Sequence, residues 1–204
     1  MMQRIFYTML FGIAFIMPAF AQASFGVKGG LNLASINIDN SKMIWTWHAG
    51  AFSHVAIGRK VFFQPEILIS RKGTSLPDFF YTSDLQFNIV YLSMPLLMGV
   101  EAGEHFSFHL GPELSYRLAG ELEIEDQGSN TDKEYYKDWD FGLDAGITYQ
   151  MTRSFVLTLL YCFGFTDVMQ IKFVDENGQD LGGFNEGKNR VLQLSLSYTF
   201  ENEK

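Results

Sequence analysis

Few residues in this chain have the types and spacing needed for chemistry, and the first candidates are a histidine and a serine. In His105-Phe106-Ser107 the imidazole comes two residues before the hydroxyl. A histidine base beside a serine can activate the hydroxyl for acyl transfer. The motif lies at a predicted short turn, however, and no acid on the same face is placed to orient the histidine. The alternative is an unreactive histidine beside an inward-facing serine, and we predict no catalytic residue.

Acidic segments could supply oxygen ligands to divalent cations. Asp175-Glu-Asn-Gly-Gln-Asp180 is similar to a calcium loop, but its glycine is fourth, where an EF-hand needs it sixth, and no glutamate comes twelfth. A second segment carries the acids Glu121, Glu123, Glu125, Asp126, Asp132 and Glu134. The alternative for both segments is a solvated acidic loop, and neither spacing demands an ion.

Other cofactor signals are missing from the sequence. There is no Walker loop, dinucleotide fingerprint or zinc motif. His48 and His54 lack metal-ligand spacing, and the single Cys162 excludes an internal disulfide. We expect Cys162 to be a small residue on an inner face. We therefore predict no cofactor and no metal.

A third set of candidates consists of charged residues at alternate positions in apolar-rich segments. Successive side chains of a strand point to opposite faces, so these charges share a face that the large apolar residues leave free. If that face is the interior, the cations must pair with the acids or remain hydrated. We predict a lumenal charge network, with a merely hydrated lining as the alternative, formed by Lys28, Glu66, Glu113, Arg117, Asp140 and Asp144.

The elements that must position these residues are strands. Period-2 alternation predicts eight strands of 11 to 14 residues, against a usual length of about 5 or 6. A tilted strand needs about 9 to 11 residues to cross a bilayer. The predicted ranges are Phe25–Ile36, Trp45–Gly58, Val61–Arg71, Asn88–Glu101, His105–Leu118, Trp139–Gln150, Ser154–Thr166 and Asn189–Phe200.

The predicted connections alternate between short and long. The short ones are Gly58–Lys60, Ala102–Glu104 and Met151–Arg153. The long ones are rich in Gly, Asn, Asp, Ser and Glu, and they cover Asn37–Ile44, Lys72–Phe87, Ala119–Asp138 and Asp167–Lys188. Short periplasmic turns with long external loops are typical of outer-membrane barrels. We therefore expect long loops outside the cell and both termini in the periplasm.

The bulk of the apolar side chains indicates which face is outside. In the last predicted strand, Leu192, Leu194 and Leu196 alternate with Gln193 and Ser195. The interior of an eight-stranded barrel is only just filled by side chains, so the many large apolar residues must face outward, against lipid. The sequence predicts an all-β fold, an eight-stranded antiparallel up-and-down transmembrane β-barrel. Aromatic residues near strand ends are predicted to lie at the membrane interfaces, namely Trp45, Trp47, Trp139, Tyr149, Tyr198 and Phe200.

The N-terminus has the pattern of an export signal. Arg4 precedes an apolar stretch and the small-residue site Pro18–Ala21. We predict a signal peptide over residues 1–21, cleaved to leave a barrel domain over 22–204; cleavage after Ala23 and an uncleaved anchor are the alternatives. The net charge of −8 and pI of about 4.9 argue against a nucleic-acid partner.

Several motifs, taken together, resemble the PorT-like outer-membrane β-barrel family of Bacteroidota. They span the mature chain in order and comprise Gly26–Leu33, Tyr91–Leu97, Gly111–Tyr116, Phe141–Gly146 and Tyr161–Asp167. The resemblance implies an eight-stranded outer-membrane barrel without catalytic residues. One namesake takes part in type IX secretion, a role that a shared barrel does not by itself imply.

These observations predict a monomeric, non-enzymatic barrel of the bacterial outer membrane with a structural or surface-binding role. The expected partners are lipid and lipopolysaccharide, whose phosphates divalent ions could bridge to the acidic loops, and the barrel-assembly machinery. The alternatives are an accessory component of a protein-export machinery, which implies an envelope protein partner, and an outer-membrane lipid-modifying enzyme. A soluble ligand-binding barrel is disfavoured by the number of large apolar residues.

Overall fold

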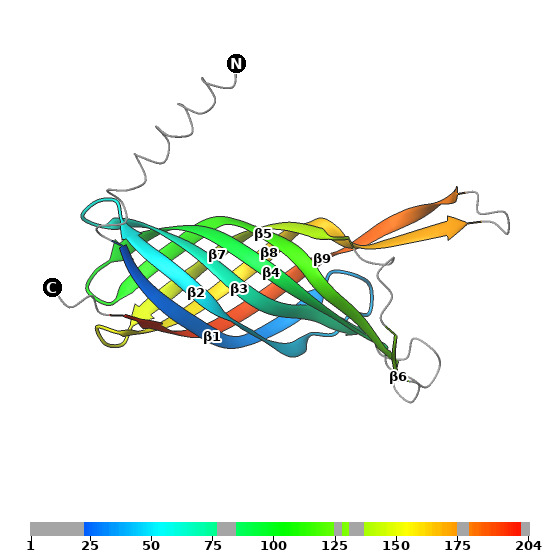
Figure 1. Ribbon diagram of the computed structural model, residues 1–204, viewed down its shortest axis with the longest axis horizontal. Helices are drawn as coiled ribbons and strands as arrows, with labels where there is room; N and C mark the ends of the chain where they lie inside the picture. Colours follow the sequence, from blue (N-terminus) through cyan, green and yellow to red (C-terminus); the bar gives the residue numbers. More distant parts are fainter. Residues whose placement is uncertain (1–22, 77–84, 125–127, 131–136, 175–179, 201–204) are drawn as a thin grey trace, which may run out of the picture.

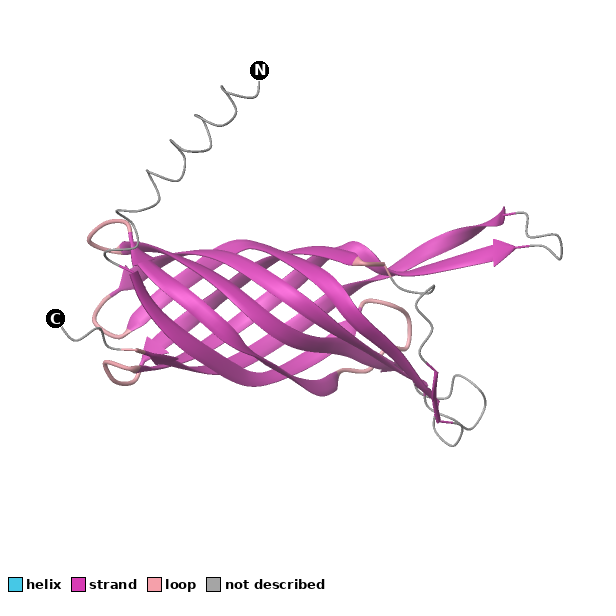
Figure 2. Ribbon diagram, viewed as in Figure 1, coloured by secondary structure: helices cyan, strands magenta, loops and turns pink. Residues whose placement is uncertain are grey.

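Strands dominate the computed structural model (Figures 1 and 2), which describes residues 23–76, 85–124, 128–130, 137–174 and 180–200. The predicted signal peptide, residues 1–21, lies outside these ranges. The strands are β1 (Ala23–Ile36), β2 (Ile44–Ala56), β3 (Val61–Leu76), β4 (Leu85–Ala102), β5 (Phe106–Ile124), β6 (Gly128–Asn130), β7 (Trp139–Gln150), β8 (Phe155–Val174) and β9 (Asp180–Thr199).

The sheet closes on itself. All pairings are antiparallel, and the order β4-β3-β2-β1-β9-β8-β7-β5 is completed by pairing of β4 with β5. The short β6 pairs only with the end of β5, so eight strands form the barrel. The predicted fold class is confirmed. Closure leaves the barrel wall without an open edge, which a bilayer could not satisfy with hydrogen bonds.

Large apolar side chains cover the outside of the barrel. In β9, Leu192, Leu194 and Leu196 are 39%, 47% and 48% exposed, whereas Gln193 and Ser195 between them are buried. The same alternation runs through β1, β5, β7 and β8. Such a surface is compatible with a lipid medium and not with water.

The two ends of the barrel differ. At one end, called the short-turn end, lie the connections 57–60, 103–105 and 151–154 together with the described chain ends, Ala23 and Phe200. The opposite end, called the long-loop end, carries the longer connections. There β8 and β9 continue past the barrel wall as a two-stranded ribbon, because β7 pairs with β8 only as far as Gly164 (Figure 1).

Several strands extend into segments that the sequence pattern assigned to long loops. β3 continues to Leu76, β5 to Ile124, and β8 and β9 cover most of Asp167–Lys188. The expected loop boundaries were wrong at these places because the ladder hydrogen bonds continue beyond the apolar alternation. Lys72 therefore lies in a strand rather than in a loop.

Two inward-facing glycines allow close contact between neighbouring strands. A Cβ atom at Gly30 in β1 would overlap the backbone oxygen of Leu194 in β9. A Cβ atom at Gly50 in β2 would overlap the backbone oxygen of Ile67 in β3. Glycine in a strand commonly marks such a close approach.

Among the described residues, none belongs to a helix with the length and hydropathy needed to cross a membrane.

Candidate functional site

Among the residues that the structure describes, two buried ion pairs lie in the lumen, and each bridges strands that are not neighbours. The first joins Lys28 of β1 to Glu66 of β3. Lys28 Nζ lies 3.0 Å from Oε1 and 2.9 Å from Oε2 of Glu66, and Gln64 Nε2 donates to Oε1 at 2.8 Å. Gly50 stands opposite Lys28 in the β1–β2 register, so no β2 side chain occupies the space that the lysine crosses.

The second ion pair joins Lys72 of β3 to Glu113 of β5. Lys72 Nζ lies 2.5 Å from Glu113 Oε1, and the two side chains are 0% and 2% exposed. Ser115 Oγ donates to the same carboxylate oxygen at 2.9 Å, and the ammonium also lies 5.2 Å from the ring centroid of Tyr91. A buried charge is tolerated when it is paired and hydrogen-bonded in this way.

Neutral hydrogen bonds fill the space between the ion pairs. His48 Nδ1 lies 2.7 Å from Asn32 Oδ1, and its Nε2 lies 2.8 Å from Ser195 Oγ. Asn32 Nδ2 donates to Ser70 Oγ at 3.2 Å. His48, on β2, therefore links side chains of the first and the last strand, β1 and β9, inside the barrel.

The two aspartates of the expected charge network lie on β7 and differ in their surroundings. Asp140 accepts from Asn189 Nδ2 at 2.7 Å and from the hydroxyl of Thr166. Asp144 is fully buried next to Glu113 and Cys162, and neither of its oxygens has a hydrogen-bond partner in the described part of the chain.

The last member of that network, Arg117, forms an ion pair near the long-loop end. Its Nη2 donates at 2.6 Å to Asp138, an acid outside the predicted set, and its Nε donates to the backbone oxygen of Lys137 at 3.3 Å. Asp138 precedes β7 at the long-loop end, and the fold brings it beside the later part of β5. The pairing of Arg117 with the predicted lumenal acids stays a prediction.

Lys72 was not among the predicted site residues, although the sequence carries a signal for it. Glu66, Leu68, Ser70, Lys72 and Thr74 follow one another at period 2, and all are buried. Alternation thus continues beyond Arg71, but polar residues on the inner face look like the start of a loop when each is taken alone.

An apolar cluster occupies the lumen at the long-loop end. Ile36, Ile89, Tyr91 and Val168 are buried together, and Ile38 and Phe87 pack against them. These residues come from β1, β4 and β8 and the connection after β1. The charged part of the lumen is therefore separated from the long-loop end by tightly packed side chains.

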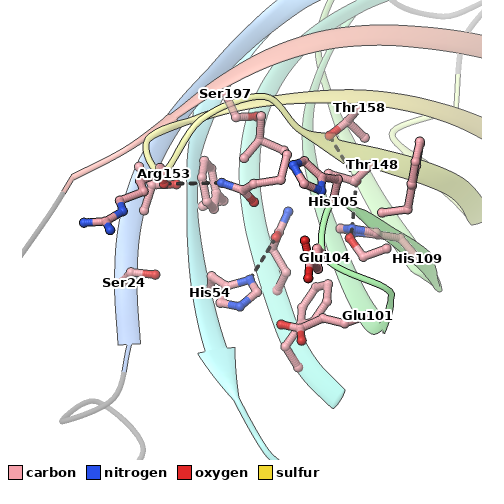
Figure 3. A pocket seen from close by; sticks show the side chains of 18 of the residues that line it. Ser24, His54, Glu101, Glu104, His105, His109, Thr148, Arg153, Thr158 and Ser197 are labelled. Atoms are coloured by element: carbon pink, nitrogen blue, oxygen red, sulfur yellow. Dashed lines mark hydrogen bonds between the residues drawn. The ribbon is translucent and has the colours of Figure 1, made fainter. Parts of the chain in front are cut away.

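A cavity of about 470 Å³ opens at the short-turn end (Figure 3). Its lining includes His54, Glu101, His105, His109 and Arg153. The ring of Phe62 lies between two of these histidines, with centroids 4.3 Å from His54 and 5.1 Å from His109. This cavity, called the short-turn cavity, is lined by polar and charged side chains together with a few apolar ones.

The structure pairs Ser107 with a different histidine from the one that the sequence motif offered. Ser107 Oγ lies 3.4 Å from His109 Nε2, and Thr148 Oγ1 lies 2.8 Å from the same nitrogen. His105 instead stacks on Tyr149, with ring centroids 5.9 Å apart. His109 Nδ1 has no hydrogen-bond partner among the described residues, so no acid orients this ring for base catalysis.

Much of the two acidic segments lies outside the described residues, whereas the predicted interface aromatics lie within them. Most of the calcium-like segment, residues 175–179, lies outside the described residues, as do 125–127 and 131–136 of the second acidic segment. The six predicted interface aromatics are exposed on the outer surface. Trp45, Trp47 and Trp139 lie toward the long-loop end, and Tyr149, Tyr198 and Phe200 toward the short-turn end.

A closed antiparallel barrel with an apolar outside and a polar, ion-paired inside defines an outer-membrane β-barrel protein. The chain belongs to the family described as outer membrane protein beta-barrel domain, whose family model matches residues 20–170. It is therefore assigned to the outer membrane. A comparison with curated protein sequences gave no match.

Solved structures share the fold at low sequence identity. Neisserial surface protein A superposes with a TM-score of 0.53 at 10% identity, covering 88% of this chain and 97% of the other. A major outer membrane protein from Thermus thermophilus gives a TM-score of 0.50 at 12% identity, covering 87% and 99%. At these identities the similarity concerns the fold alone.

Proposed function

We propose that this protein is a plugged, non-catalytic outer-membrane barrel with a structural role or a role in binding at the surface. The observation that carries the proposal is the filled lumen. The ion pairs Lys28–Glu66 and Lys72–Glu113 are buried, and the apolar cluster around Ile89 lies between them and the long-loop end. We expect side chains packed in this way to interrupt any continuous water column through the described part of the lumen.

The proposed orientation puts the long-loop end outside the cell and the short-turn end in the periplasm. Bacterial outer-membrane barrels combine short periplasmic turns with longer external loops. The described chain ends lie at the short-turn end, which is the arrangement expected of a chain exported by a signal over residues 1–21. Loops that reach beyond the membrane, such as the ribbon of β8 and β9, would then be the surface available to partners (Figure 1).

The absence of catalysis is part of the proposal. It is supported by His109, the histidine nearest to a lumenal serine, which has no acid on Nδ1 among the described residues. A lipid-modifying enzyme would need an activated nucleophile that lipid can reach, whereas Ser107 lines the interior cavity.

Planar-bilayer recording tests the plugged lumen. Wild-type protein folded in detergent is inserted into the bilayer beside an open porin prepared in the same way, and we expect no steady single-channel conductance. The matched variant replaces both Lys72 and Glu113 by Ala and should give brief openings, because the packed pair is removed. Large, steady conductance of the wild type would contradict the proposal.

A second candidate function follows from the motif resemblance. The PorT-like family, to which we propose that the chain belongs, includes a protein that acts in type IX secretion. A free-standing barrel should be recovered as a monomer after gentle solubilisation and pull-down. A stable stoichiometric envelope partner would favour a role in protein export instead.

A further inference from the structure

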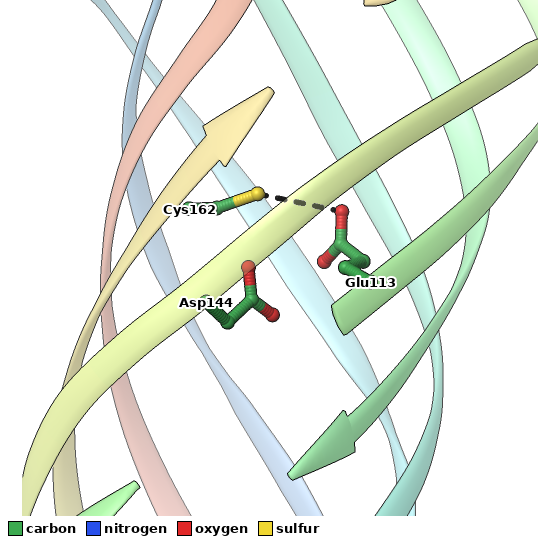
Figure 4. A group of neighbouring side chains, drawn as sticks. All are labelled: Glu113, Asp144 and Cys162. Atoms are coloured by element: carbon green, nitrogen blue, oxygen red, sulfur yellow. Dashed lines mark hydrogen bonds between the residues drawn. The ribbon is translucent and has the colours of Figure 1, made fainter. Parts of the chain in front are cut away.

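Glu113, Asp144 and Cys162 form a cluster of potential metal ligands inside the lumen (Figure 4), called here the Glu–Asp–Cys cluster. One ligand atom of each residue lies within 4.8 Å of the other two. The residues come from β5, β7 and β8, which are neighbours in the barrel wall. The register explains the convergence, since Asp144 is the partner of Cys162 on one side and of Gly111, two residues from Glu113, on the other.

Asp144 is the observation that points to a ligand. It is 0% exposed, and neither carboxylate oxygen has a hydrogen-bond partner among the described residues. Glu113 Oε2 also lacks one, and the single thiol proton of Cys162 is directed to Glu113 Oε1 at 3.5 Å. Buried polar groups are nearly always satisfied, so this cluster calls for an additional occupant.

Two other buried acids of the lumen differ from Asp144, because donors satisfy their carboxylate oxygens. Glu66 is satisfied by Lys28 and Gln64, and Asp140 by Asn189 and Thr166. Asp144, by contrast, has ligand atoms from two other side chains beside it, and the donor near its carboxyl group is the Cys162 thiol, whose single proton is directed to Glu113.

Charge balance indicates the kind of occupant. If the Cys162 thiol is deprotonated, three anionic ligands surround the site, and the ammonium of Lys72, 4.0 Å from Cys162 Sγ, neutralises one of them. Two negative charges remain, which one divalent cation would balance. Calcium and magnesium prefer oxygen ligands only, whereas zinc and similar borderline cations take both thiolate and carboxylate.

We propose that the Glu–Asp–Cys cluster binds one divalent cation of the zinc class. On binding, the S–H bond of Cys162 breaks, the sulfur bonds to the cation, and the proton is released to water without any change of oxidation state. The rival occupant is a single proton shared by the carboxyl groups of Asp144 and Glu113. It would satisfy one oxygen of each but would leave the second oxygen of Asp144 without a donor.

A route to the site leads from the short-turn cavity. His109, Thr148 and Thr158 line that cavity on the same strands as the cluster, each four residues from the cluster member on its own strand. On β5 and β7 the intervening inward-facing residues are Gly111 and Gly146, but on β8 the intervening residue is Leu160, whose buried side chain lies over Gly146. A cation that enters from the short-turn end would therefore require the Leu160 side chain to move, but it need not pass the apolar cluster at the long-loop end.

Cadmium provides the test, because a cadmium–thiolate bond gives an ultraviolet charge-transfer band and the chain has one cysteine. The full-length protein, folded in detergent and freed of metal, is titrated with Cd²⁺. We expect one Cd²⁺ per chain, displacement by Zn²⁺, and tighter binding as the pH rises, because the thiol must lose its proton. Cys162→Ser should abolish the band, and Asp144→Asn should weaken binding by at least about tenfold.

The control is Asp140→Asn, which removes another buried acid of β7 that lies outside the cluster and should leave the titration unchanged. Heat-modifiable gel migration verifies that each variant is folded. The proposal is overturned if folded wild-type protein gives no band, a result that favours the shared proton. It is equally overturned if Asp144→Asn binds Cd²⁺ as tightly as the wild type, or if only urea-unfolded protein binds it.

Discussion

Lys72 Nζ lies 2.5 Å from Glu113 Oε1 in the lumen, although β4 separates the strands that carry the two residues. The pair therefore bridges two strands that both flank β4, across the inner face of that strand. Removal of one partner leaves a buried charge alone, whereas removal of both leaves only a loss of packing. The two kinds of substitution should therefore differ in stability.

Lys72→Met should lower the free energy of unfolding by about 3–5 kcal/mol, since Glu113 would remain charged and unpaired. The double variant Lys72→Met with Glu113→Gln should lose less than the single one. Urea unfolding in lipid vesicles, followed by tryptophan fluorescence in metal-free buffer, measures both. Lys60→Met, in an exposed turn, is the control and should unfold like the wild type. A single variant as stable as this control would mean that the pair contributes nothing.

Gly30→Ala should reduce both stability and the yield of folded barrel. Its Cβ atom would overlap the backbone oxygen of Leu194 in the paired strand, and overpacking of this kind costs about 1–3 kcal/mol. Gly58→Ala is the matched change, because no heavy atom lies within 4 Å of a Cβ placed there. The ratio of heat-modified to unmodified bands after refolding gives the comparison; equal yields would count against the tight β1–β9 contact.

Leu194→Arg tests whether the outer surface meets lipid. Leu194 is 47% exposed and pairs with Leu31 in the middle of the β1–β9 ladder. An arginine at the bilayer midplane costs about 2–4 kcal/mol, against about 0–1 kcal/mol near the interface. Phe200→Arg, just after the end of β9, should therefore be much milder. If the two variants had similar unfolding free energies in vesicles, positions 194 and 200 would not lie at different depths in the membrane.

Orientation can be tested by labelling introduced cysteines on whole cells. In a Cys162→Ser background, Asp39→Cys lies in the connection after β1, at the long-loop end, and Arg59→Cys lies in a short turn. A maleimide that cannot cross the outer membrane should label position 39 and not position 59. Lysed cells, in which both positions should react, provide the control. The reverse pattern would invert the proposed topology.

The barrel itself could be predicted from sequence because the inside and outside of a strand alternate residue by residue. The exposed Leu194 and buried Ser195 illustrate the pattern. Side-chain bulk then determines which face of the strand points outward, because the lumen of a small barrel cannot accommodate the large apolar side chains. Both signals are local, so one strand already contains them.

Ion-pair partners could not be predicted in the same way. Lys28 and Glu66 were expected in one network, but which acid meets which cation depends on the stagger between strands, and local alternation does not specify that stagger. Arg117 shows the result, since it meets Asp138 from the segment before β7. Lys72 was missed because a polar residue that follows an apolar run resembles a loop, although inside a barrel it is an ordinary lining residue.

The hydrogen bond from Phe200 N to Phe25 O, 2.8 Å long, has a consequence for the connectivity of the chain. It places the last described strand beside the first, so the strands follow each other around the barrel in a ring. A gene rearranged to begin at the short turn around Gly58, with the present ends joined by a short linker, would encode the same cylinder. The starting point of the barrel domain is thus interchangeable among the short turns, and a circularly permuted chain that keeps an export signal in front should fold into the same barrel.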